Sequence, residues 1–225
     1  MPAGPDLGSS ADAGARAELS GLRDVYVVLG YGSLIWDLEV LAPQVRLPWY
    51  MDAGPRLPME FSRISPKRLM GLVVVIDADH GQPCPTHAIA SRRDDIHAVA
   101  EDLRERERAN NLDYIGAVCL RTGFERALQP HVATQIRDWC AAAGAAGAVW
   151  ADLPRNFQQR TGGEFSIGSA LAYLHTLSGA NLEEAVRYIE NAPSATDTRL
   201  RRVLAVDAWW QAVAEALPPT PGNTV

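Results

Sequence analysis

The segment VVLGYGSLIWD, residues 27–37, joins a run of β-branched residues to a turn that contains two glycines and a serine. Together with the two residues before it, the run reads VYVVLG, which is typical of a strand buried on both faces. Three known motifs begin with such a strand and a glycine-containing turn: the dinucleotide fingerprint, the P-loop and the nucleophile elbow of serine hydrolases. The residues that follow Gly30 decide among them.

None of the three motifs fits. The dinucleotide fingerprint requires its third glycine, and the nucleophile elbow its second, at the position of Ile35. A P-loop requires a lysine after the glycines, and residues 30–36, GYGSLIW, contain none. What remains is the 31–34 turn, formed by Tyr31, Gly32, Ser33 and Leu34. Its consecutive backbone N–H groups form a nest suited to a carboxylate or another small anion. The alternative is a tight turn whose glycines only permit positive φ.

The composition of the chain restricts the class of partner. The 225 residues carry 21 basic and 27 acidic side chains, a net charge of 21 − 27 = −6, which argues against nucleic acid or an anionic membrane as a partner. No apolar run reaches the roughly 20 residues that a membrane span requires. The three cysteines are irregularly spaced and predict neither a disulfide framework nor a zinc motif. We therefore expect a reduced, cytoplasmic protein that holds no metal and no cofactor.

Sequence patterns predict an α+β fold. Strands are expected at residues 25–30, 59–65, 71–79, 113–123 and 145–153, with 86–91 as the return partner of 71–79 and with an irregular stretch over 38–58. Helices are expected from an N-cap at Ser91 to about Asn110, and over residues 130–143. The expected architecture is a mixed β-sheet or small barrel of about five to seven strands with flanking helices and a helical C-terminal section.

The C-terminal section has its own helix signals. A helix from Ser166 is expected to end with Gly179 as its C-cap, Asn181 and Glu184 to form a capping box for the next helix, and residues 196–217 to form a third. The predicted organisation is a disordered leader over residues 1–23, an α+β domain over 24–160, a helical section packed on it over 161–217, and a tail over 218–225.

One carboxylate on the helix that precedes Asn110 lies where an apolar residue is expected. The apolar stripe Ile96, Val99, Ala100, Leu103 follows the i, i+3, i+4, i+7 pattern, and its next member is Glu107. A carboxylate on a core-facing stripe must find a partner, face a cavity or take a raised pKa. The alternative is that Glu107 lies at a fraying helix end and reaches water.

These two features together resemble the γ-glutamylcyclotransferase-like superfamily, and its ChaC-type branch in particular. Members of that branch commonly read FGYGSLIW after their first strand, and residues 29–36 here read LGYGSLIW. The family pattern Leu-x-x-Arg/Gln-Glu around the catalytic glutamate matches residues 103–107 and selects Glu107. The resemblance covers residues 25–121; the helix over 130–143 and the C-terminal helices depart from the family pattern.

The resemblance implies an enzyme that releases 5-oxoproline from a γ-glutamyl peptide or amide, such as glutathione, by attack of the substrate's own α-amine. Glu107 would be the general acid and base, and Tyr31, Gly32, Ser33 and Leu34 would bind the substrate. Three points stay open: a γ-glutamylamine or other conjugate as the substrate, a catalytically silent protein of the same fold that binds a metabolite or a partner, and the oligomeric state.

Overall fold

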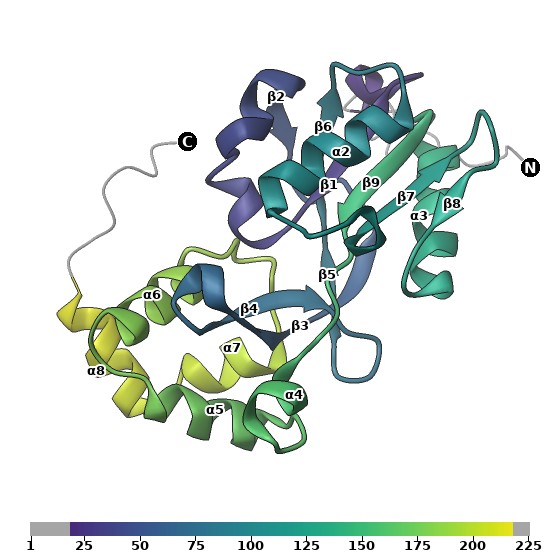
Figure 1. Ribbon diagram of the computed structural model, residues 1–225. Coiled ribbons are helices and arrows are strands. Elements are labelled where there is room, and N and C mark those ends of the chain that lie inside the picture. Colours follow the sequence, from purple (N-terminus) through teal and green to yellow (C-terminus); the bar gives the residue numbers. More distant parts are fainter. Residues whose placement is uncertain (1–18, 218–225) are drawn as a thin grey trace, which may run out of the picture.

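The computed structural model describes residues 19–217, and within them the strands form two sheets. A six-stranded mixed sheet has the order β2-β6-β1-β9-β7-β8, and a three-stranded antiparallel sheet has the order β4-β3-β5 (Figure 1). The strands are β1 (Tyr26–Gly30), β2 (Val45–Tyr50), β3 (Arg56–Ser65), β4 (Gly71–Ile76), β5 (Gln82–Pro85), β6 (His87–Ser91), β7 (Ile115–Cys119), β8 (Glu125–Arg126) and β9 (Gly147–Ala151). The fold is therefore α+β with a mixed sheet, as predicted. The described strands number nine and form two open sheets, not a barrel of five to seven strands.

Helices pack around both sheets. The α-helices are α2 (Ile96–Glu107), α3 (Pro130–Ala143), α4 (Phe157–Thr161), α5 (Ile167–Thr176), α6 (Gly179–Glu190), α7 (Arg199–Leu204) and α8 (Ala208–Ala216). The short 3-10 helices are η1 (Ser20–Leu22), η2 (Gly32–Ile35), η3 (Glu39–Gln44), η4 (Pro66–Arg68) and η5 (Leu112–Tyr114). The predicted helix over 130–143 is confirmed at both ends.

Strand β1 is central because it is buried on both faces and paired on both edges. It runs antiparallel to β6 and parallel to β9. Side chains alternate between the faces of a strand: Tyr26 and Val28 join the cluster that includes α2, whereas Val27 and Leu29 join the cluster that includes α3 and the three-stranded sheet. The run of apolar residues in β1 is continuous because the strand contacts one hydrophobic layer on each side of the sheet.

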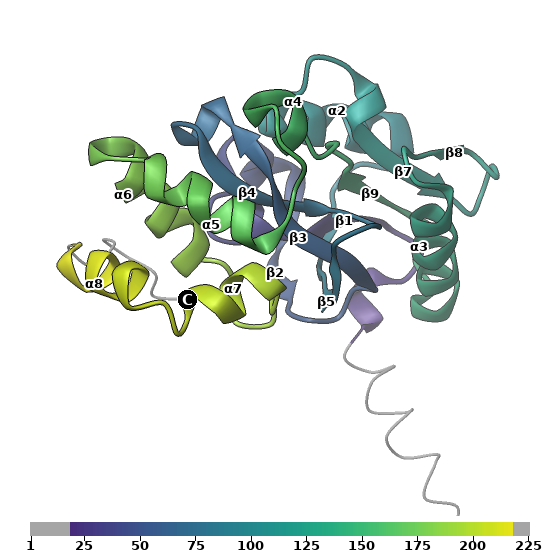
Figure 2. The same cartoon turned by 90° about the horizontal axis from the view of Figure 1, so that it is seen from below.

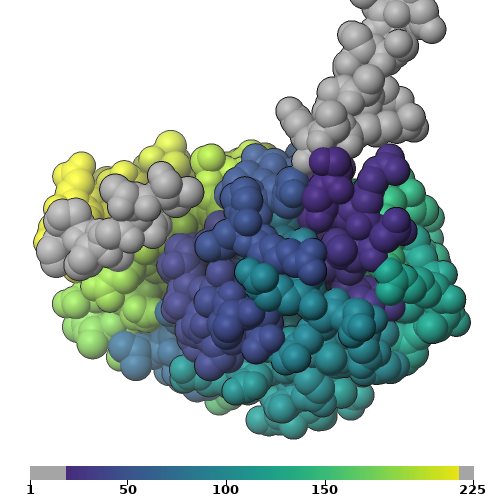
Figure 3. All heavy atoms as spheres, turned by 90° about the horizontal axis from the view of Figure 1, so that it is seen from above, coloured from purple at the N-terminus to yellow at the C-terminus, as the bar shows by residue number. Residues whose placement is uncertain are grey.

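The C-terminal helices cover the three-stranded sheet. Helix α6 packs on β4, and α4 and α7 pack on β3. Figure 2 shows α5 to α8 on one side of this sheet and α3 on the far side of the molecule. The space-filling view has the same arrangement, with the yellow C-terminal helices and the green segment around α3 at opposite sides and the N-terminal half between them (Figure 3).

Several local predictions are wrong, and tertiary pairing explains the larger errors. Residues 86–91 do not return along β4; β6 pairs with β1 and β2, while β4 pairs with β3. The stretch 38–58 contains β2, which forms an edge of the six-stranded sheet. Helix α2 is capped by Asp95, not by Ser91, and ends at Glu107, not at about Asn110.

The C-terminal helix boundaries also differ from prediction. Gly179 begins α6 with positive φ and does not cap α5, which ends at Thr176 with Leu177 as its C-cap. Asn181 lies inside α6, and Glu184 pairs with Arg68. The single helix expected over 196–217 is two helices, because Asp207 starts α8 as its N-cap.

The predicted leader lies partly, and the predicted tail wholly, outside the residues that the structure describes. Residues 1–18 and the predicted tail over 218–225 lie outside the described residues. Leu22, inside the predicted leader, is buried in η1. None of the helices between residues 19 and 217 has the length and apolar character needed to cross a membrane.

Candidate functional site

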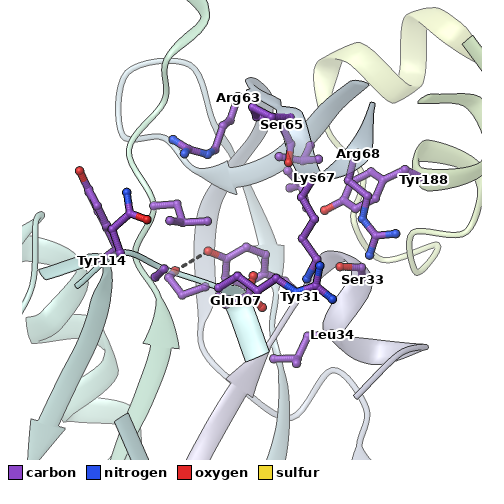
Figure 4. Close-up of a pocket in the computed structure, with 18 of the residues that line it drawn as sticks. Tyr31, Ser33, Leu34, Arg63, Ser65, Lys67, Arg68, Glu107, Tyr114 and Tyr188 are labelled. Carbon is purple, nitrogen blue, oxygen red and sulfur yellow. Dashed lines mark hydrogen bonds between the residues drawn. The ribbon is translucent and has the colours of Figure 1, made fainter. Parts of the chain in front are cut away.

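A cavity of about 390 Å³ lies between the end of β1, the three-stranded sheet and the end of α2. Its wall includes residues from segments far apart in sequence: the 31–34 turn, β3 and η4, the end of α2, α4, and Tyr188 of α6. Figure 4 shows Arg63 and Ser65 along one edge, Tyr114 to one side, Ser33, Lys67, Arg68 and Tyr188 toward the other, and Glu107 with Tyr31 between them. Its volume suits a small ligand.

The 31–34 turn takes its shape from Gly32. After β1 the chain enters η2, and Gly32 has φ +56°, a left-handed conformation that favours glycine. A Cβ at this position would lie 2.6 Å from the Tyr188 hydroxyl and 2.9 Å from Val74 Cγ1. Tyr31, Ser33 and Leu34 line the cavity; Gly32 does not line it but permits the close approach of α6 and β4.

Glu107 faces the same cavity as this turn. It is the last residue of α2, its side chain is 16% exposed, and Arg108 follows in a left-handed conformation that ends the helix. The neighbouring Arg106 is fully buried and donates from Nε and Nη2 to the Asp37 carbonyl, while its Nη1 lies 3.5 Å from Glu107 Oε1. The carboxylate therefore has a fixed cation behind it and the cavity in front of it.

Two buried tyrosines flank the carboxylate. Tyr31 donates its hydroxyl proton to the Ala151 carbonyl. Burial raises the pKa of Tyr31 well above its ordinary value, and the negative charges of Asp152 and Glu107 add to the rise. Burial, followed by the charge of Glu107, also raises the pKa of Tyr188, against the opposing charge of Arg68. Both hydroxyls stay protonated at neutral pH; the single Tyr31 proton is already donated to Ala151, so Tyr188 is the one of the two with a proton left to donate.

Cationic side chains outnumber carboxylates on the cavity wall. Five lining residues are basic, and Glu107 is the one lining carboxylate within the described chain; the basic residues are Arg63, Lys67, Arg68, Arg108 and Arg160. Just behind the wall, Glu39 pairs with Lys67 and Arg108. Although burial acts in the opposite direction, Arg106 and Lys67 lower the pKa of Glu39. A protein with a net charge of −6 thus has a locally positive cavity, which suits an anionic ligand.

Sequence reasoning selected part of this wall and missed the rest. It named Glu107 and the 31–34 turn, which the structure brings to one cavity. The aromatic residues Tyr173 and Trp150 do not line this cavity: Tyr173 donates to the Met70 carbonyl, and Trp150 is fully buried in the core. Tyr114 and Tyr188 line the cavity instead.

The sequence contains a usable signal for Arg106 and Arg63, which are not among the predicted site residues. Arg106 lies three residues after Leu103, beside the apolar stripe that also selected Glu107, and it is buried like the apolar members of that stripe. Arg63 and Ser65 lie two positions apart on β3, so their side chains share one face of the strand, and both line the cavity. Arg63 forms no surface ion pair with Glu60 of the same strand, because Glu60 is fully buried and accepts from the backbone N–H of Arg199.

Comparison of the chain with models of protein families, with curated proteins and with solved structures gives no match. Within residues 19–217, no three His, Cys, Asp or Glu side chains gather as a metal site would require. The cavity itself is therefore the feature that indicates a function.

Proposed function

We propose that this protein is a γ-glutamylcyclotransferase-like enzyme that releases 5-oxoproline from a γ-glutamyl peptide or amide. One observation carries the proposal: the Glu107 carboxylate and the 31–34 turn line a single cavity. The two segments are distant in sequence, since 73 residues separate Ser33 from Arg106, whose side chains are in contact. A base and an anion-binding turn are the two parts that cyclisation of a γ-glutamyl group requires.

The chemistry uses the substrate's own nucleophile. The α-ammonium of the γ-glutamyl group first loses a proton to Glu107, and the free amine then attacks the γ-carbonyl carbon. A bond forms between the α-nitrogen and that carbon, the bond from the carbon to the leaving nitrogen breaks, and Glu107 returns its proton to the departing amine. Glu107 then takes the second proton from the ring nitrogen and passes it to the released amine, which leaves as an ammonium. The products are 5-oxoproline and a free amine, and no residue of the chain is covalently modified.

The cavity wall holds the substrate in the conformation that cyclisation requires. The α-carboxylate of the substrate binds near the 31–34 turn, where the Ser33 hydroxyl, Lys67 and Arg68 provide donors and positive charge. Holding this carboxylate while the γ-carbonyl lies over Glu107 folds a flexible chain into a conformation ready for ring closure. The Tyr188 hydroxyl lines the cavity, lies close enough to Glu107 for the charge of that carboxylate to act on it, and can donate to the oxygen that becomes negative during attack.

A 5-oxoproline release assay tests the proposal. Glutathione, γ-glutamyl amino acids and γ-glutamylamines are incubated with wild type, Glu107→Gln and Glu105→Gln. Glu105 is exposed on the same helix, so its variant is the matched control. We expect product from wild type and Glu105→Gln, and at least about a hundredfold less from Glu107→Gln, the scale of a lost general base. Equal product from Glu107→Gln would assign the base to another residue, and no product from any protein would favour a binding role.

A further inference from the structure

One end of the cavity holds two arginines that lack a counter-charge. Arg63 of β3 and Arg160 of α4 both line the wall, and among the described residues neither has a carboxylate within 4.0 Å. The other lining cations differ: Lys67 and Arg108 pair with Glu39, and Arg68 pairs with Glu184. Figure 4 shows Arg63 on the other side of the cavity from Ser33 and Leu34 of the 31–34 turn, and Arg160 lies near enough to Arg63 for its charge to act on the guanidinium.

The fold holds these two arginines in place. The Asn156 side chain, at the N-terminus of α4, accepts from the Ile64 backbone N–H at 2.8 Å and donates to the Ile64 carbonyl at 3.0 Å. This double hydrogen bond fixes α4 against β3 directly beside Arg63. Arg63 Nη1 also donates to the Pro154 carbonyl, which orients the guanidinium and leaves its other N–H groups for a ligand.

Keeping two like charges together is unfavourable without an anion. Burial lowers the pKa of Arg63, and the positive charge of Arg160 adds to this effect, so the two guanidinium groups repel each other across the cavity. An arginine remains charged in proteins, and a pair of them matches the geometry of a carboxylate, sulfonate or phosphonate group. A bound anion would remove the repulsion and satisfy the free donors.

We propose that Arg63 and Arg160 form an anion subsite for the leaving group, so that the preferred γ-glutamyl substrates carry a second acidic group on the amine that is released. This inference rests on the proposed function, and it favours acidic leaving groups over the simple γ-glutamylamines. The first anion, the α-carboxylate, binds beside Ser33, and the second binds on the Arg63 side of the cavity, with Glu107 between them.

A matched ligand series tests the subsite. The γ-glutamyl amides of β-alanine, taurine, 2-aminoethylphosphonate and propylamine share one leaving-chain length and end in a carboxylate, a sulfonate, a phosphonate and a methyl group. Binding is measured by calorimetry on Glu107→Gln, which keeps the compounds intact, and 5-oxoproline release is measured separately on wild type. We expect each acidic compound to bind at least about tenfold more tightly than the propylamide.

Two further variants distinguish binding at the proposed subsite from a general effect of the protein's net charge. Arg160→Gln, added to Glu107→Gln, removes an exposed side chain that makes no hydrogen bond within the described residues, so the fold is kept. Arg46→Gln is the matched control, since Arg46 is exposed on β2 outside the cavity and changes the net charge equally. We expect Arg160→Gln to reduce the preference to within about threefold and Arg46→Gln to leave it unchanged.

The outcomes are distinct. Equal affinity across the series, no measurable binding, or the same loss of preference in Arg46→Gln overturns the anion subsite. A preference for acidic compounds that depends on Arg160, without 5-oxoproline release, supports the subsite and overturns the proposed reaction. Release of 5-oxoproline at equal rates from all four compounds, with equal affinities, overturns the subsite and leaves the reaction in place.

Discussion

Arg106 and Glu107, neighbours at the end of α2, form a contact of 3.5 Å between a fully buried guanidinium and a carboxylate at the cavity wall. The same guanidinium donates to the Asp37 carbonyl, just beyond the 31–34 turn, and lies 3.5 Å from the Ser33 hydroxyl. One side chain therefore fixes the helix end relative to the turn. The distance between the proposed base and the proposed anion site depends on Arg106 more than on any direct contact between them.

Replacing Arg106 is expected to cost both stability and activity. Arg106→Met leaves the buried Asp37 carbonyl without its donors and removes the cation behind Glu107. We expect a loss of about 3 kcal/mol in the free energy of unfolding, measured by urea denaturation, with 5-oxoproline release lost alongside it. Arg104→Met, which removes a partly exposed pair with Glu101, should change stability by less than about 1 kcal/mol. Equal effects of the two variants would contradict this role for Arg106.

Gly32→Ala separates backbone strain from steric conflict. Both Gly32 and Gly123 have positive φ, but a Cβ at Gly123 meets nothing within 4 Å, whereas one at Gly32 conflicts with Tyr188 and Val74. We expect Gly123→Ala to cost about 1–2 kcal/mol of stability from strain alone. Gly32→Ala should cost more and should displace α6 from the turn, and thermal unfolding of the two variants measures the difference. A smaller loss for Gly32→Ala would show that the turn adapts.

The raised pKa of Glu60 predicts that the free energy of unfolding depends on pH. Burial raises the pKa of Glu60 above its ordinary value of 4.5, although the backbone N–H groups of Phe61, Leu200 and Arg199 and the Thr198 hydroxyl oppose the rise. Above that ordinary value the folded state therefore holds a proton that the unfolded state has lost. Stability from this group is greatest at low pH and falls as pH rises through the folded pKa.

The measurement compares wild type with Glu60→Gln, which does not titrate. The difference in unfolding free energy, wild type minus variant, should decrease as pH rises above 4.5 and then level off. Glu105→Gln, at an exposed position on α2, provides the control. A difference that stays constant or increases with pH would show that the folded state does not retain the proton on Glu60.

The three cysteines should be unreactive until the chain unfolds. Cys84, Cys119 and Cys140 are each at most 2% exposed, and burial raises the pKa of Cys140 to about 12, so its thiolate is scarce at neutral pH. Ellman's reagent should label native protein slowly and unfolded protein with three equivalents. Rapid labelling under native conditions would contradict the burial of these thiols.

Local patterns in the sequence predicted the elements that depend on nearby residues. The continuous run at β1 and the proline that begins α3 each carry their own signal, and the apolar stripe of α2 located Glu107. These features follow from side-chain periodicity and from local backbone preference.

Pairing between distant segments was not predictable in the same way. The sequence 86–91 reads as a buried strand whichever neighbour it has, so nothing local shows that β6 pairs with β1 and not with β4. Tyr188 looks like an ordinary residue on the apolar face of an amphipathic helix until α6 is placed against Gly32. The cation pair of Arg63 and Arg160 likewise exists only because Asn156 docks α4 on β3.

The order in which the cavity wall is synthesised has a consequence for a growing chain. The 31–34 turn and Glu107 belong to the first half of the sequence, whereas Arg160 and Tyr188 are added much later. On the ribosome, the early half emerges before β9, which pairs with β1 and β7, and before the residues of α4 and α6 that complete the cavity wall. The ligand pocket is therefore completed only when nearly the whole chain has been translated, so a nascent or truncated chain lacks the enclosure that the finished protein gives its ligand.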